Sequence, residues 1–366
     1  MQRSRLTRAR IARRVVVLGA LASVVLSLAT LLLLGISLDT SLGVAGMVFG
    51  VVTFVLSELR EREAPSKTIA YLGQEDASFD ANILVGIKSS LDHNMPYVLQ
   101  PVTYTPDVGD PVAWQVAQLG SSKFETADAI VILPCHDDMR IWQAMVRLSS
   151  RGIKIVVMDF EPPQDLFVNQ SLPIPSFVSS DFTEGGVKAG EIVASFLESH
   201  PHATALILIG PRWSKPGAGR SSRILFVLAQ HGLLGRSDTM ELTSWDPKTV
   251  VPGVLSRVTK MLSANDGELV IFAGDDRLLN EISGAVVEFV SDMTRLNFVG
   301  YDGARGPDGG YLVKNSRHCI GTIDTQPEAQ GYATGKVLLD AYQNGVSGLS
   351  RVLVVPRSVG EAELNP

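Results

Sequence analysis

The sequence predicts an α/β fold of two doubly wound lobes with parallel sheets, preceded by two transmembrane helices. The first observation is that short apolar runs alternate with segments of helical periodicity over about 300 residues after position 67, a pattern typical of parallel sheets with helices on both faces. The second is that a single charged residue, Asp39, lies between Val15 and Leu56. With 366 residues, the chain is long enough for two ordinary domains.

The N-terminal region divides into a basic tail, two apolar segments and a linker. Residues 1–14 contain six arginines and no acid. Residues 15–36 would form a helix of about 33 Å, enough to cross a bilayer, and residues 41–57 are at the lower limit for a span. Residues 58–67 carry charges of both signs and read as a linker. We therefore expect a transmembrane helical hairpin over 15–57 and a soluble body over 68–366.

The orientation of these helices follows from the positions of Lys and Arg, which remain on the cytoplasmic side of a membrane. The arginines of residues 1–14 place the N-terminus in the cytoplasm. If both segments span, the body returns to the cytoplasmic side of the cell membrane. If only residues 15–36 span, as a signal anchor, the body lies outside. The hairpin is the preferred topology, and the second alternative stays open.

Charge and cysteine content exclude several functional classes. The residues after position 14 carry 26 basic and 38 acidic side chains, a net charge of −12. A body this acidic is poorly suited to phosphate backbones, so we expect no nucleic-acid partner. The two cysteines, Cys135 and Cys319, are too few for a disulfide framework or a Cys-rich zinc site. A P-loop motif is also absent from the sequence, and we expect no cofactor.

The strands of the body are predicted from short apolar runs, whose continuous apolar character suits strands buried on both faces. They are Ile69–Gly73, Tyr97–Gln100, Ala129–Leu133, Lys154–Met158, Ala205–Ile209, Leu269–Ala273 and Asn297–Gly300.

Three helices are predicted from apolar stripes at helical spacing. One stripe contains Trp142, Met145 and Val146, with Asp137 or Asp138 as its cap and Gly152 at its end. The other two stripes run through residues 189–197 and 278–289.

Several segments, taken in order, resemble one known family. The segments are Ile69–Gly73 with Ser78-Phe79-Asp80 and Gly86-Ile87, Asp128–Pro134 with Arg151–Asp159, Phe177–Asp181 with Gly185-Gly186 and Ala189-Gly190, Ile271–Asp276, Phe298–Gly303 and Gly321–Pro327. Together they are similar to the type I periplasmic binding proteins, in particular the ribose- and galactose-binding branch. The similarity covers about residues 68 to 360.

The resemblance implies a two-lobed clamp, with a hinge of three crossing segments, that closes on a small solute and has no catalytic residues. It implies a first lobe of about 68–180 and 326–346, and a second of about 181–325 and 347–366. The family's repressor branch has an N-terminal helix-turn-helix where this chain has its predicted membrane helices. That branch is therefore not expected.

The resemblance also implies the candidate ligand contacts. Phe79 and Trp245 would be stacking aromatics of opposite lobes, and the structural alternative for each is a core position. Asp80, beside Phe79, would be a further contact. Asp159, Asp275 and Asp302 follow apolar strands. The alternative role is helix N-capping, expected especially of Asp276, which precedes Leu278. The remaining candidates are Arg223, or Arg220 if the loop shifts, and Thr325.

Some residues depart from the family pattern. Phe160 and Phe182 stand where the family often has polar side chains, and Thr325, followed by Gln326, replaces an amide. The pocket is therefore expected to be more apolar than a ribose site. A deoxy sugar, an aromatic glycoside or a ligand that is not a sugar would fit it, and loss of binding is a further alternative.

The sequence thus favours a membrane-anchored, non-enzymatic receptor for a small, sugar-like solute. Its membrane partner would be the permease of an ABC-type transporter or a signalling protein. One alternative is an enzyme that uses the run Cys135-His136-Asp137-Asp138, whose residue types also occur in metal sites. Another is a clamp that has lost its ligand and serves as a protein-interaction scaffold.

Overall fold

The computed structural model describes most of the body of the protein. The described residues are 66–74, 77–104, 109–211, 214–290, 292–306, 310–316, 318–345 and 350–364. The predicted membrane helices, 15–36 and 41–57, lie outside them. Within these ranges, every helix is too short or too polar to cross a membrane. Lys67–Pro366 forms one compact unit.

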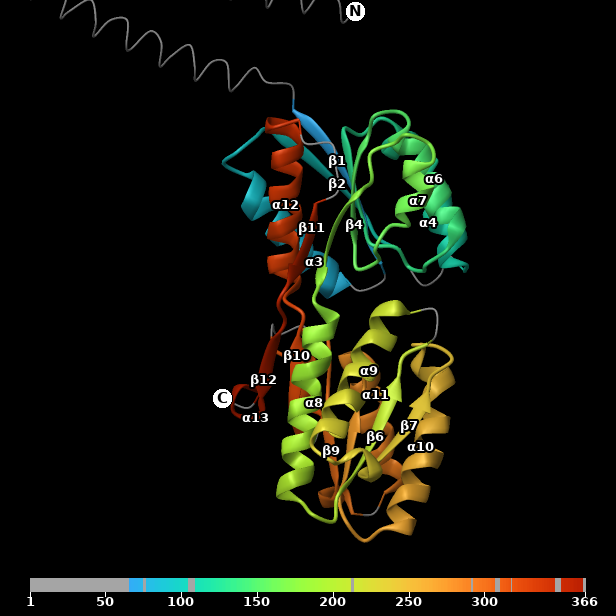
Figure 1. The fold of residues 1–366 in the computed structure, drawn as a ribbon, viewed down its shortest axis with the longest axis vertical. Helices are drawn as coiled ribbons and strands as arrows, with labels where there is room; N and C mark the ends of the chain where they lie inside the picture. Colours follow the sequence, from blue (N-terminus) through green and yellow to red (C-terminus); the bar gives the residue numbers. More distant parts are fainter. Residues whose placement is uncertain are drawn as a thin grey trace, which may run out of the picture. The chain divides into compact units, whose positions relative to one another are not determined.

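The first lobe is built on a six-stranded, fully parallel sheet (Figure 1). Its strand order is β11 (Arg351–Val354), β5 (Ser176–Ser180), β4 (Lys154–Met158), β3 (Ala129–Ile132), β1 (Lys67–Leu72), β2 (Tyr97–Val102). Helices α3 (Ala77–Leu91) and α12 (Pro327–Gln343) cover one face, and α4 (Pro111–Leu119), α5 (Ser122–Glu125), α6 (Met139–Ser149) and α7 (Gln164–Val168) cover the other. Each face encloses its own apolar core.

The second lobe repeats this plan, with one antiparallel strand at its edge. Its strand order is β12 (Arg357–Gly360), β10 (Cys319–Asp324), β9 (Leu296–Val299), β8 (Leu269–Phe272), β6 (Thr204–Ile209), β7 (Ser237–Glu241). Helices α8 (Phe182–Ser199) and α9 (Lys215–Gln230) cover one face, and α10 (Pro247–Ala264), α11 (Asp276–Phe289) and α13 (Glu361–Leu364) cover the other. Short 3₁₀ turns lie at Leu234–Arg236, Met293–Arg295 and Leu312–Asn315.

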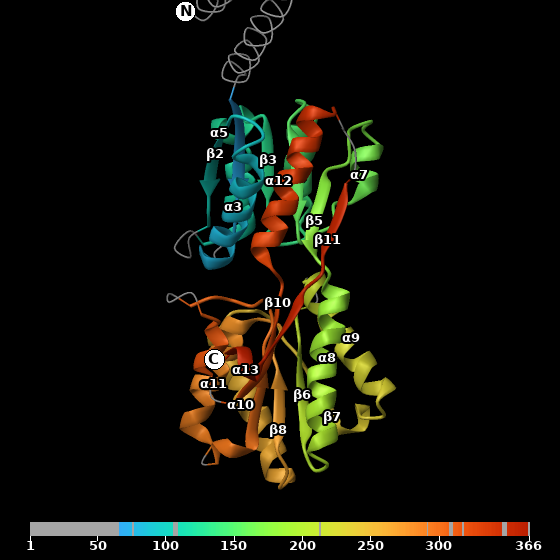
Figure 2. The ribbon, with the colours of Figure 1, turned by 90° about the vertical axis from the view of Figure 1, so that its left-hand side faces the viewer.

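The chain passes between the lobes three times, and Figure 2 shows these segments lying beside one another. They join β5 to α8, β10 to α12, and β11 to β12. The amide of Asp181 donates to the carbonyl of Val354 (2.8 Å), and the Gln326 side chain donates to the carbonyl of Val355. These bonds tie all three segments into one hinge.

The third crossing corrects one predicted boundary. The sequence assigned residues 347–366 to the second lobe, but β11 pairs in parallel with β5 of the first lobe. The chain leaves the first lobe only after Val354. The strand is short and directly followed by Val355 and Pro356, so its apolar pattern is too brief to identify from the sequence.

All seven predicted strands are confirmed within one or two residues at their ends. The three predicted helices are confirmed as well, and Asp138 rather than Asp137 caps α6. The prediction did not include β5, β7, β10, β11 or β12 among its strands. Of these, β7 reads Ser-Asp-Thr-Met-Glu and is an exposed edge strand, which explains its weak apolar signal.

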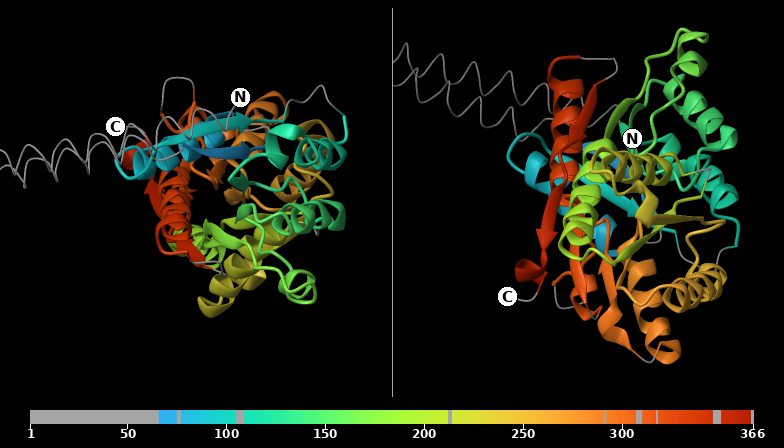
Figure 3. Two further views of the ribbon diagram at one scale, coloured as in Figure 1. Left: turned by 90° about the horizontal axis from the view of Figure 1, so that it is seen from above. Right: turned by 60° about the horizontal axis from the view of Figure 1, so that its bottom comes forward.

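Helices α3 and α12 come from distant parts of the sequence and pack backbone against backbone (Figure 3). A Cβ at Gly86 would lie 2.0 Å from the carbonyl oxygen of Glu328, and one at Gly331 would lie 2.1 Å from that of Ile83. Glycine is therefore required at both contacts, because the neighbouring atoms belong to the main chain and cannot turn away.

We expect Gly331→Ala to destabilise the protein by about 1–3 kcal/mol through overpacking of α3 against α12. The matched control is Gly284→Ala in α11, where an added Cβ meets nothing within 4 Å. The control should gain up to about 1 kcal/mol from helix propensity. Urea unfolding followed by circular dichroism measures both, and equal stabilities of the two variants would contradict the packing argument.

Candidate functional site: a cavity between the lobes

A cavity of about 250 Å³ lies between the carboxyl ends of the two sheets. It is lined by Gln74, Ser78, Phe79, Asn82, Leu133, Cys135, Asp159, Phe160 and Pro327 of the first lobe, and by Ser214, Pro216, Arg220, Trp245, Gly274, Asp275, Arg277, Asp302, Gly303, Ala304 and Arg305 of the second. The structure thus brings together six of the nine predicted contacts. They are Phe79, Asp159, Arg220, Trp245, Asp275 and Asp302.

Two aromatic side chains reach the cavity from opposite lobes. Phe79 lies in the first turn of α3 and packs partly on the core of the first lobe. Trp245 lies in the loop before α10, where Asp246 caps the helix. Three glycines pack closely against the indole of Trp245. A Cβ added at Gly210 would lie 2.6 Å from the indole, and a Cβ added at Gly217 would lie 2.8 Å from it. The third is Gly274, at 3.2 Å. The indole is therefore held in place before any ligand binds.

Arg220, on the second turn of α9, is the central charged group of the cavity. Its guanidinium donates to the carbonyl of Gly274 (2.6 Å) and pairs with Asp302 (3.1 Å). The rings of Tyr301 and Phe182 lie 4.1 and 4.7 Å from its central carbon. The residue is only 8% exposed, and burial of this kind requires compensating acids.

One hydrogen-bond donor of the Arg220 guanidinium is unpaired within the described ranges. Its Nε has no hydrogen-bond acceptor among the residues that the structure describes. A buried donor without an acceptor costs about 1–3 kcal/mol. This unpaired donor adds to the cost of burying the Arg220 guanidinium.

Two of the acids, Asp159 and Asp302, occupy the ends of strands from different lobes. Asp159 follows β4 directly, and Asp302 comes three residues after β9 ends at Val299. Their backbones have φ values of 61° and 98°, in the left-handed region that few residues other than glycine, asparagine and aspartate adopt. Ser179 donates its hydroxyl to Asp159 (3.1 Å). Strained backbone at two converging strand ends is typical of functional sites.

Burial changes the protonation of both acids. It raises the pKa of Asp159 to about 6, while the nearby Arg220 and the Ser179 hydroxyl act in the opposite direction. Burial also raises the pKa of Asp302 to about 7, again opposed by Arg220. The Asp302 side chain remains 27% exposed toward the cavity. Both carboxyls therefore titrate close to neutral pH, where a ligand can change their charge.

Asp275 and Asp276 have separate structural roles. Asp275 caps α11 through the amides of Arg277 (2.7 Å) and Leu278 (3.2 Å), and it also lines the cavity. Asp276, the expected cap, is instead fully buried and accepts from Thr322 (2.8 Å) and the amide of Ala304 (3.0 Å). Burial raises its pKa well above the usual range. Asp276 therefore anchors the loop that carries the cavity residues Gly303 to Arg305.

The other three predicted contacts lie outside the cavity lining. Asp80 is 2% exposed and accepts from the Tyr71 hydroxyl (2.6 Å). Arg223 is on an exposed position of α9, where its guanidinium lies near Phe226 (5.8 Å). Thr325 is buried in the hinge and donates to the carbonyl of Asp302 (3.0 Å). Of the two alternative arginines, the structure thus places Arg220 at the site.

The structure also separates the two phenylalanines that depart from the family pattern. Phe160 lines the cavity at 7% exposure. Phe182 lies outside the lining, and its ring instead covers Arg220. Sequence reasoning missed Gln74, Ser78 and Asn82 as cavity residues. The helical spacing of Ser78 and Asn82, one turn apart beside Phe79, is a signal that could have identified them.

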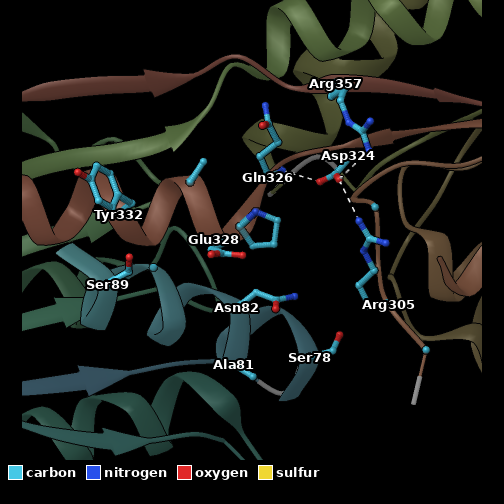
Figure 4. Close-up of a pocket in the computed structure, with 15 residues that line it drawn as sticks. Ser78, Ala81, Asn82, Ser89, Arg305, Asp324, Gln326, Glu328, Tyr332 and Arg357 are labelled. Atoms are coloured by element: carbon cyan, nitrogen blue, oxygen red, sulfur yellow. Dashed lines mark hydrogen bonds and ion pairs between the residues drawn. The ribbon is translucent and has the colours of Figure 1, made fainter. Parts of the chain in front are cut away.

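A second, more open pocket of about 870 Å³ adjoins the first and is shown in Figure 4. Its walls come from α3, the start of α12, the loop after Asp302 and the start of β12. The lining residues are Ser78, Ala81, Asn82, Gly86, Ser89, Gly303, Arg305, Gly306, Asp324, Gln326, Pro327, Glu328, Ala329, Tyr332 and Arg357. We call this the outer pocket, and the cavity around Arg220 the inner cavity.

The Cys135–Asp138 run does not converge on one point. Asp137 accepts from the indole of Trp142 (2.8 Å), and Asp138 caps α6 and pairs with Arg140 (2.9 Å). Burial raises the pKa of the Cys135 thiol to about 12, so the thiol is neutral at physiological pH. Within the described part of the chain, no group of three or more His, Cys, Asp or Glu side chains is arranged to hold a metal ion.

No protein-family model and no curated protein sequence matches the chain. Solved structures do match. A solute-binding protein of an ABC transporter from Actinobacillus succinogenes, with bound D-allose, has a TM-score of 0.63 and 19% identity, covering 82% of this chain and 99% of its own. A second, from Bacillus halodurans with bound myo-inositol, has a TM-score of 0.63 and 15% identity, covering 82% and 96%.

A LacI transcriptional regulator from a Rhodococcus species has a TM-score of 0.59 and 18% identity, covering 80% of this chain and 97% of its own. The chain therefore has the two-lobed α/β fold that periplasmic solute-binding proteins and LacI regulators share. The fold expected from the resemblance is confirmed.

The two acids of the inner cavity predict a pH dependence of stability. Folding raises the pKa of Asp302 from its ordinary value of 3.8 to about 7. A carboxyl of this kind contributes fully to stability at a pH below 3.8, and the contribution is lost as pH rises through the pKa of the folded state. Asp302→Asn removes that loss. We therefore compare the melting temperatures of Asp302→Asn and of the unchanged protein at each pH. The difference, variant minus unchanged protein, should increase by about 2–5 °C between pH 4 and pH 8.

The matched control is Asp266→Asn, at an exposed position of the second lobe. Its melting temperature should keep a constant difference from that of the unchanged protein across the same pH series. A constant difference for Asp302→Asn as well would show that Asp302 is ionised throughout this range.

Proposed function

We propose that the protein is a membrane-anchored, non-enzymatic receptor that binds a small, sugar-like solute in the inner cavity. The observation that carries this proposal is the meeting of Phe79 and Trp245, from opposite lobes, around the Arg220–Asp302 pair. A sugar presents apolar ring faces and a rim of hydroxyls. It is recognised by aromatic plates together with charged or amide groups that exchange hydrogen bonds with the rim.

The polar groups of the inner cavity suit hydroxyls because they include both donors and acceptors. Asp159 and Asp302 offer acceptors, and the guanidinium of Arg220 offers N–H donors. Gln74 and Asn82 can both donate and accept. The bound D-allose and myo-inositol of the two solute-binding neighbours are polyhydroxylated rings, which supports the same ligand class for this chain.

Ligand contacts in both lobes also provide a reason for closure. A solute held by Phe79 and Trp245 at once stabilises the conformation in which the lobes are close. The three hydrogen-bonded crossing segments would act as the hinge. The closed form would then be recognised by a membrane partner, either a transport permease or a signalling protein.

A thermal-shift screen of sugars and polyols tests the binding proposal. At a ligand concentration 100 times the dissociation constant, we expect about 2.7 kcal/mol of stabilisation, a rise in melting temperature of roughly 5–10 °C. Asp302→Ala and Trp245→Ala should abolish or greatly reduce the rise, since one removes a charged acceptor and the other the stacking surface.

Two variants serve as controls. Phe226→Ala removes an aromatic side chain that is 49% exposed on α9, and Asp266→Asn removes an exposed acid. Both should keep the full shift. If a ligand raises the melting temperature of Asp302→Ala and of Trp245→Ala as much as that of the unchanged protein, it binds elsewhere. This result would contradict the proposal. A broad screen without a single hit would favour the scaffold alternative.

The membrane anchor is proposed from the sequence of residues 15–57, in the hairpin topology with the body on the cytoplasmic side. This side favours a role in sensing, whereas an external body would favour transport. Ser66 is the first described residue and is exposed, so it is a suitable reporter position.

We expect Ser66→Cys, in a background without Cys135 and Cys319, to resist a membrane-impermeant thiol reagent in intact cells. It should react after lysis, because the hairpin keeps residue 66 on the cytoplasmic side. Labelling that is already complete in intact cells would place the body outside and favour the transport role.

A further inference from the structure

The outer pocket is continuous with the inner cavity. The two share five lining residues, which are Ser78, Asn82, Gly303, Arg305 and Pro327. Binding sites for small molecules usually enclose about 300–1,000 Å³. The inner cavity, at about 250 Å³, falls just below this range, and the outer pocket, at about 870 Å³, adds much more space than one small ring requires.

The outer pocket has little need of an anionic ligand, because its two arginines already face acids of the protein. The Asp324 carboxylate accepts from the Tyr311 hydroxyl (2.9 Å) and lies 3.6 Å from Arg305 and 4.0 Å from Arg357. Arg357 also pairs with Glu363 (2.8 Å). An anion would have to compete with these contacts, so the pocket favours a neutral polar ligand.

The opposite wall carries the side chains that sugar recognition requires. Figure 4 shows Ser78, Asn82 and Ser89 along α3, with Glu328 and Tyr332 on the adjacent α12. Tyr332 is 45% exposed. It offers the outer pocket an aromatic surface, as Phe79 and Trp245 do in the inner cavity. From Ser78 to Ser89 the helix advances about 16 Å, which is longer than a single sugar ring.

We infer that the ligand is a glycoside of at least two linked rings, not a monosaccharide. The first ring would occupy the inner cavity, and the next would leave it past Asn82 and Arg305 to lie against Tyr332. This inference rests on the proposed function and specifies its ligand class. It also assigns Tyr332, Ser89 and Glu328 to ligand binding, none of which was a sequence-predicted contact.

Calorimetric titration of the full chain in detergent tests the inference with matched sugars. The probes are glucose with maltose and cellobiose, galactose with lactose and melibiose, and any monosaccharide identified by the thermal-shift screen with its disaccharides. We expect one disaccharide to bind at least 10-fold more tightly than its monosaccharide. Tyr332→Ala should lower the affinity for that disaccharide about 3- to 10-fold and leave the affinity for the monosaccharide unchanged.

Further variants separate the two parts of the site. Ser89→Trp narrows the outer pocket without touching the inner cavity, so it should also lower the affinity for the disaccharide selectively. Trp245→Ala should lower the affinity for both sugars. The control is Phe289→Ala, at a residue of α11 that is 65% exposed, and it should change neither affinity.

The outcomes distinguish the inference from the proposed function. Monosaccharides that bind as tightly as every disaccharide would overturn the inference and leave the proposed function standing. The same holds for a disaccharide whose affinity is unchanged by both Tyr332→Ala and Ser89→Trp. If no sugar of either length binds, the proposed function fails, and the inference fails with it.

Discussion

The buried guanidinium of Arg220 is the interaction on which the rest of the site depends. A charge at 8% exposure is stable only if nearby acids and carbonyls replace the water that it has lost. Asp302 and the carbonyl of Gly274 do so within the second lobe, and Asp159 contributes from the first. The Arg220 charge therefore couples the two lobes electrostatically, and any solute in the inner cavity must fit around this arrangement of charges.

The parallel sheets explain why these groups meet. In such a sheet the loops at the carboxyl ends of the strands lie at one edge, and here the edges of both lobes border the inner cavity. Cys135, Asp159, Trp245, Asp275 and Asp302 all follow strands in this way. Three crossing segments keep the two edges opposed, and the close packing of α3 on α12 fixes the helix that carries Phe79.

The sequence was sufficient for the fold and for the residues at strand ends, because both follow from local patterns. The buried strands and the acids after them are adjacent in the chain. Residues such as Arg305 and Tyr332 could not be predicted in this way. They reach the site through a loop held by the buried Asp276 and through a helix contact between distant segments, and neither arrangement has a local signal. Asp80 illustrates the opposite error, since a polar residue beside Phe79 faces Tyr71 instead of the cavity.

The position of Phe182 changes how the polarity of the site should be understood. Two phenylalanines in place of polar residues predicted an apolar pocket, yet only Phe160 of the two lines it. Phe182 and Tyr301 cover the guanidinium of Arg220 and exclude water from it, which strengthens its attraction to the acids. The substitution thus intensifies the electrostatics around Arg220 and leaves the lining polar. Arg220 is already paired with Asp302, so a ligand beside it does not have to supply the opposing charge. This arrangement supports the proposal of a neutral, hydroxyl-rich ligand.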